Sequence, residues 1–247
     1  MDELKIDNPA QRLLDILEEG KQYNTGENCR AVWKKMLHIH QDAEHHILIR
    51  LSQMMALPER IIQVRENNFS SLRAKSTHWE ACVGTAFTSQ NLNESWHTFI
   101  RYIDERTLYE LGTLSDLFET RGTHSTIDTN EIDSLLNRIR ELREDIRHSE
   151  LPPAMKTMLL KQLTQIQEAL ESYFISGVEP VMDAVQSTLG LAVIAPEYKE
   201  EIKSGSGSEF GDRISSLLGD VANVVTVAGA LPALPAAIQS ALSLLSK

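Results

Sequence analysis

Cysteine is nearly absent from this 247-residue chain, which contains only Cys29 and Cys82. Two cysteines without a paired spacing cannot form the disulfide framework of a small secreted domain, and they favour a reducing compartment. The first five residues, Met1 to Lys5, are charged and lack the apolar segment of a secretory signal. We therefore expect a cytoplasmic protein.

Alternating apolar and polar runs, the pattern of half-buried β-strands, are also missing. Apolar residues recur instead at helical spacing, and at 42% of the chain they suffice for a buried core. These features predict an all-α protein, a bundle of about eight to ten helices. Phosphate-binding glycine loops, GxSxG and CxxC motifs are absent too, so nothing indicates the enzyme and metal-binding classes that use them.

Positive charge is scarce relative to negative charge. The chain has 24 Lys and Arg against 35 Asp and Glu, a formal net charge of −11. An acidic surface repels phosphate backbones, so we do not expect a nucleic-acid partner.

The longest regular pattern is a pair of apolar stripes that average about 3.5 residues per repeat, as in coiled coils. The stripes comprise Ile132, Leu135, Ile139, Leu142 and Ile146, then Leu159, Leu163, Ile166 and Leu170. Pro152 and Pro153 separate them. The sequence therefore predicts a long antiparallel helical hairpin around which the other helices pack.

Proline, glycine and capping residues predict where other helices begin and end. Asn8 before Pro9 is typical of a helix start, and Gly20 of a helix end. Pro58 predicts that the helix carrying Ile47, Leu51 and Met54 ends before it.

Composition predicts four regions. They are an N-terminal helical region (1–120), the hairpin with the following helix in the same core (128–196), a flexible linker (204–211) and an apolar tail (212–247). Ser-Gly repeats before Glu209-Phe210 are also typical of an engineered joint.

The tail has an uncharged run of 26 residues, Val221 to Ser246. As one helix it would be about 39 Å long, enough to cross a bilayer, but Pro232 and Pro235 interrupt it. Both halves are amphipathic, so the tail could dock on its own core, on another subunit or on a membrane surface. The predicted contact residues are Leu217, Leu218, Val221, Val225, Ile238, Leu242 and Leu245.

Two groups of residues could bind metal or react through a thiol. On a continuous helix His38, Asp42 and either His45 or His46 would share a face, forming half a divalent-metal site. Alternatively Asp42 caps a new helix and interrupts that face. Cys82 follows His78 by one turn, as in a thiolate–imidazole pair, but it also lies on an apolar stripe and is more typical of a structural cysteine.

Arg143 and His148 form an Arg-x4-His motif that resembles the signature of HEPN ribonucleases, which are also all-helical. The resemblance implies that two chains bring these residues together to cleave RNA. The alternative is a solvated helix end where the dipole favours a histidine. The overall pattern is also similar to uncharacterised helical proteins of bacterial genomes, which implies a bacterial or phage origin.

These observations favour a non-enzymatic helical interaction or scaffold protein without a cofactor. We expect a homo-oligomer or a protein partner, with the tail making the contact or lying on the inner membrane. The alternatives are a HEPN-like ribonuclease toxin using Arg143 and His148, and a defence or cell-death effector whose tail disrupts membranes.

Overall fold

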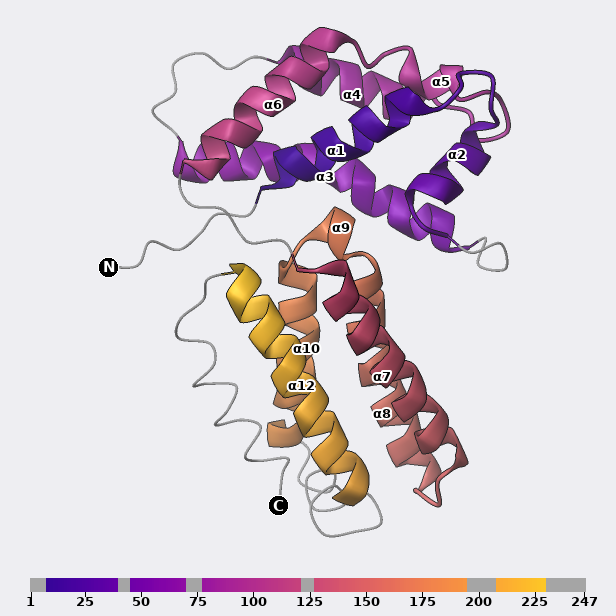
Figure 1. Ribbon diagram of the computed structural model, residues 1–247, viewed down its shortest axis with the longest axis vertical. Coiled ribbons are helices and arrows are strands. Elements are labelled where there is room, and N and C mark those ends of the chain that lie inside the picture. Colours follow the sequence, from indigo (N-terminus) through magenta and orange to yellow (C-terminus); the bar gives the residue numbers. More distant parts are fainter. Residues whose placement is uncertain (1–7, 40–44, 70–76, 121–126, 195–207, 230–247) are drawn as a thin grey trace. The chain divides into compact units, whose positions relative to one another are not determined.

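The computed structural model describes residues 8–39, 45–69, 77–120, 127–194 and 208–229. Within these residues the chain forms eleven helices and no strand, which confirms the all-α prediction (Figure 1). It divides into two compact units. The first unit comprises residues 1–123 and 174–176, and the second comprises 124–173 and 177–247.

The first unit is built from six helices and a short added segment. The helices are α1 (Pro9–Gln22), α2 (Cys29–Met36), α3 (His46–Asn68), α4 (His78–Ser89), α5 (His97–Ile100) and α6 (Glu105–Glu119). Helix α1 packs against α3 and α6, and α4 packs against α6. Most of the short helix α9 (Tyr173–Ser176) falls in the segment that clusters with this unit.

Helix α1 begins where the sequence predicts but ends later. The Asn8 side chain accepts a hydrogen bond from the Gln11 N–H at 3.0 Å, with Pro9 at the first helical position. Gly20 does not end the helix, which continues to Gln22. Instead the Gly20 carbonyl accepts the Trp96 indole N–H at 2.8 Å, and a β-carbon there would lie 3.1 Å from the Trp96 ring. Gly20 therefore allows the close approach of Trp96.

Helix α3 corrects a second prediction, because it runs without a break from His46 to Asn68 with Pro58 inside it. An internal proline costs about 3 kcal/mol through a lost hydrogen bond and a clash. Met54, Leu57 and Ile61 on either side of Pro58 are fully buried. The burial of these three side chains offsets the cost of the internal proline. The local sequence does not show this burial, because it depends on packing against other helices.

The core of the first unit is rich in aromatic rings. Trp33 lies edge-to-face against Trp96 and Phe99, with ring centroids 5.1 and 4.9 Å apart, and Phe99 also contacts Phe87 at 5.3 Å. The Trp33 indole N–H donates to the Gln90 side-chain oxygen at 2.8 Å. Aromatic pairs prefer edge-to-face or offset arrangements, so these rings stabilise the core both by burying large apolar areas and by fixing the orientation of their neighbours.

The second unit is a four-helix bundle of α7 (Thr129–His148), α8 (Pro153–Glu171), α10 (Glu179–Ile194) and α12 (Ser208–Gly229). The predicted hairpin is α7 and α8. Helix α8 also packs against α10, and α12 packs against both α7 and α10, so the four helices enclose one core (Figure 1). The hairpin thus organises the second unit, while the first has a core of its own.

Helix α12 changes the interpretation of the linker and the tail. It begins at Ser208, so the last four residues of the predicted 204–211 linker are helical. Leu217, Leu218, Val221 and Val225 are buried in the core of the second unit rather than exposed as contact residues. Their apolar stripe is covered because α12 closes the bundle. Ile238, Leu242 and Leu245 lie outside the described residues.

Candidate functional site

The predicted histidine metal site required one continuous helix, and the structure has two separate helices there. Helix α2 ends at Met36, and α3 begins only at His46. His38 has a left-handed backbone (φ 50°), which interrupts the helical path, and Asp42 lies outside the described residues. The rings of His45 and His46 are 4.2 Å apart, but no helical face joins them to His38.

The Arg-x4-His motif lies on α7, and its two side chains have separate partners. A separation of five residues places them about 140° apart around a helix. Arg143 donates to the Gln167 side chain of α8, while His148 Nδ1 lies 2.8 Å from the Glu144 carbonyl oxygen. A single chain therefore does not bring Arg143 and His148 together.

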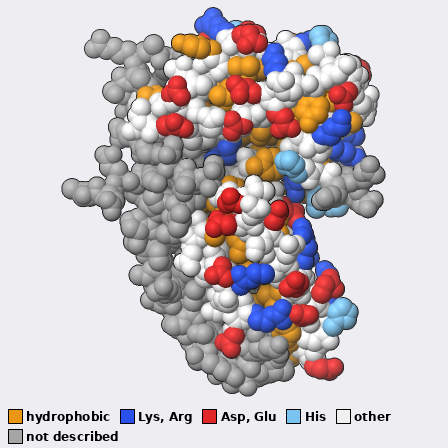
Figure 2. All heavy atoms as spheres, viewed as in Figure 1, with side chains coloured by type: hydrophobic (Ala, Val, Ile, Leu, Met, Phe, Trp, Pro, Cys, Tyr) orange, Lys and Arg blue, Asp and Glu red, His pale blue; other side chains and the backbone are white. Residues whose placement is uncertain are grey.

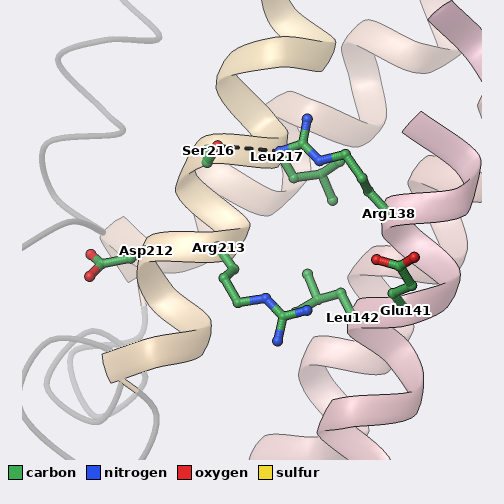
Figure 3. Close-up of a pocket in the computed structure, with 7 residues that line it drawn as sticks. All are labelled: Arg138, Glu141, Leu142, Asp212, Arg213, Ser216 and Leu217. Atoms are coloured by element: carbon green, nitrogen blue, oxygen red, sulfur yellow. Dashed lines mark hydrogen bonds between the residues drawn. The ribbon is translucent and has the colours of Figure 1, made fainter. Parts of the chain in front are cut away.

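A pocket of about 360 Å³ between α7 and α12 contains two arginines that are already paired (Figure 3). Arg138 bonds to Asp220 at 2.5 Å and to the Ser216 hydroxyl at 3.2 Å, and Arg213 bonds to Asp145 at 2.7 Å. Glu141 and Asp212 also line the pocket. The positive charge of each arginine is neutralised by its own aspartate, and the two ion pairs join α12 to α7.

Three different donor side chains converge in the first unit. His78 begins α4, Cys82 follows one turn later, and Asp104 caps the N-terminus of α6. His78 Nε2 lies 2.9 Å from Asp104 Oδ2 and 3.5 Å from Cys82 Sγ, and the three donor atoms all lie within 4.8 Å of one another. Among the described residues this is the one cluster with the donors and spacing of a metal site.

The Asp104 carboxylate is held in place by helix α6. Its Oδ1 accepts the Thr107 N–H and the Thr107 hydroxyl, both at 2.8 Å. These hydrogen bonds, with a smaller contribution from His78, lower the pKa of Asp104 to about 2. The group is therefore a carboxylate at neutral pH. The spacing of His78 and Cys82 indicated their proximity, but nothing in the sequence pattern pointed to Asp104, which caps a different helix.

The two thiols lie in different environments. Cys29 is fully buried, and burial raises the pKa of its thiol to about 11. Cys82 is only partly buried, at the edge of the apolar face of α4. Because the thiolate is the reactive and metal-binding form, Cys82 is the better candidate for chemistry.

The first half of α3 exposes three large apolar side chains. Leu48, Ile49 and Met55 are 60%, 54% and 46% exposed. Leu48 and Met55 are two turns apart and share a face, and Ile49 flanks them. On the face shown in Figure 2, acidic, basic and apolar side chains are intermixed.

None of the described helices is both long enough and apolar enough to cross a membrane. Comparisons with protein families, curated proteins and solved structures found no match to this chain.

Proposed function

We propose that this chain is a helical interaction protein that associates with a second copy of itself through the exposed apolar face of α3. The observation that supports this is the exposure of Leu48, Ile49 and Met55 on one helix. Complete burial of an exposed side chain of this kind is worth about 1.5–3 kcal/mol, and these half-exposed side chains would gain roughly half of that. An apolar helix face on a partner would provide that burial.

The tail makes a second contribution to this proposal. Because the apolar stripe of α12 is buried in the second unit, we assign the outside contact of the tail to residues 230–247. Their sequence is uncharged until Lys247 and spaces Ile238, Leu242 and Leu245 for one helical face. A deletion that tests the tail should begin after Gly229, since removal of α12 would open the bundle.

Light scattering after size exclusion tests the proposal on the full chain. We expect the parent to be an oligomer and Leu48→Asp/Met55→Gln to be a monomer. Asp is well tolerated at position 48 because it lies in the first turn of α3. Tyr109→Asp is the matched control, since Tyr109 is 76% exposed on α6.

Two results would contradict the α3 contact: a monomeric parent at all concentrations, or a double variant with the parent's mass. The chain shortened to residues 1–229 then separates the two contributions. If only this shortened chain dissociated to a monomer, association would be assigned to the tail rather than to α3.

A further inference from the structure

We propose that His78, Cys82 and Asp104 form a binding site for a zinc-like transition-metal ion. The proposal is independent of self-association. It rests on three donors of different chemistry, contributed by the starts of two packed helices, α4 and α6. Figure 1 shows these two helices side by side in the first unit.

The hydrogen-bonding pattern argues against a catalytic triad. In such a triad, the acid and the nucleophile contact opposite nitrogens of the imidazole ring. Here Asp104 and Cys82 both approach His78 Nε2. In its neutral form this nitrogen can donate to the carboxylate or accept from the thiol, but it cannot do both. A metal ion accepts lone pairs from all three groups at once.

Two of the three donor pairs lie close to the spacing of tetrahedral zinc, and the third pair, Cys82 Sγ and an Asp104 oxygen, lies within 4.8 Å. With Zn–S of about 2.3 Å and Zn–N of about 2.0–2.1 Å, sulfur and nitrogen lie about 3.6 Å apart in a tetrahedral site. The observed distance from Cys82 Sγ to His78 Nε2 is 3.5 Å. Nitrogen and oxygen ligands should lie about 3.3 Å apart. The present 2.9 Å between His78 Nε2 and Asp104 Oδ2 is a hydrogen-bond distance that widens slightly once a metal replaces the proton.

Charge and ligand type narrow the choice of ion. A thiolate and a carboxylate together neutralise a divalent cation, and a mixed sulfur, nitrogen and oxygen set favours Zn²⁺ or Co²⁺ over Mg²⁺ or Ca²⁺. Thr107 holds the other oxygen of Asp104, in the way that outer hydrogen bonds orient metal ligands. Three protein ligands leave a fourth position for water, and the His78 and Asp104 side chains are 30% and 51% exposed. The site would therefore exchange its metal and admit a small ligand.

Cobalt provides a direct spectroscopic test on the full chain after chelator treatment. We expect one equivalent of Co²⁺ to give a thiolate charge-transfer band and the intense visible bands of four-coordinate cobalt. Cys82→Ser should abolish the charge-transfer band, and His78→Gln and Asp104→Asn should weaken Zn²⁺ binding at least tenfold. Asparagine still caps a helix, so Asp104→Asn preserves α6.

Two controls locate the metal. His148→Gln should bind Co²⁺ like the parent. His45→Gln/His46→Gln removes two histidines of the other predicted site and should also leave the spectrum unchanged. A charge-transfer band that survives in Cys82→Ser, or one that is lost in the double histidine variant, would overturn the assignment.

Thiol labelling provides a second measurement that needs no variant. We expect an aromatic disulfide reagent to modify Cys82 quickly and Cys29 hardly at all, and Zn²⁺ to slow the fast reaction at least tenfold. An unchanged Cys82 rate at saturating Zn²⁺, with no cobalt charge-transfer band, would show that the cluster is only a His78–Asp104 ion pair beside a thiol.

Discussion

Both units bury the apolar faces of their helices, but the side chains that form the two cores differ. Apart from the 23-residue α3, the first unit packs short helices around aromatic rings, including all three tryptophans of the chain. The second packs longer helices around a core of Leu, Ile and Val, with Phe210 as its buried aromatic residue among those described. A repeating aliphatic core can be identified from spacing alone, whereas an aromatic core depends on ring geometry between distant residues.

The largest effect should follow the loss of one ring from the first unit. Phe99 is fully buried and contacts Trp33, Trp96 and Phe87. We expect Phe99→Ala to lower the free energy of unfolding by about 3–5 kcal/mol, through lost burial and a residual cavity. Urea unfolding followed by tryptophan fluorescence reports this unit alone. Tyr109→Ala, at an exposed ring, should change stability by less than about 0.5 kcal/mol, and equal effects of the two variants would contradict the ring-based core.

A somewhat smaller effect is expected for an aliphatic residue of the second unit. Leu218 on α12 is fully buried, so Leu218→Ala should cost about 2–4 kcal/mol. The loss should appear in the helical circular-dichroism transition and less in tryptophan fluorescence, because the second unit has no tryptophan. Asn223→Ala is the control on the exposed face of α12. If it destabilised the protein as much as Leu218→Ala, α12 would not close the bundle as described.

A third prediction concerns the helix cap of α6. Asp104→Ala should cost about 1 kcal/mol, and Asp104→Asn less, since asparagine also caps helices. The pKa of Asp104 is lowered from 3.8 to about 2, so its carboxylate stabilises the fold above about pH 4, and this contribution is lost as pH falls toward 2. The difference in melting temperature between the parent and Asp104→Asn should therefore shrink over this range. A difference that stays constant from pH 5 to pH 2 would refute the charged cap.

The smallest effect is expected for the ion pairs between α7 and α12. Arg138 and Asp220 are 39% and 49% exposed, so solvent screens their attraction. A double-mutant cycle with Arg138→Gln and Asp220→Asn should give a coupling energy of about 0.2–1 kcal/mol that decreases in high salt. A coupling above about 2 kcal/mol would mean that the pair is shielded from solvent.

The candidate metal site combines a contact within one helix with a contact between two helices. Helical spacing placed Cys82 one turn after His78, because a turn is a local property of the backbone. It could not place Asp104 beside them, since that contact requires α4 to pack against α6. The helix expected to join His38 to His45 and His46 is interrupted for a related reason, since no spacing rule indicated the left-handed conformation at His38.

By itself the sequence determined the helical class, the cap at Asn8 and the α7–α8 hairpin, because each leaves a local pattern in the chain: apolar residues at helical spacing, a capping residue before a proline, and two apolar stripes joined by a short proline-containing turn. The tertiary structure alone decided that α3 continues through Pro58, that Gly20 accommodates Trp96, and that Leu217, Leu218, Val221 and Val225 face inward. In each case the decisive free energy comes from burial against a distant helix, and spacing along the chain carries no record of that helix.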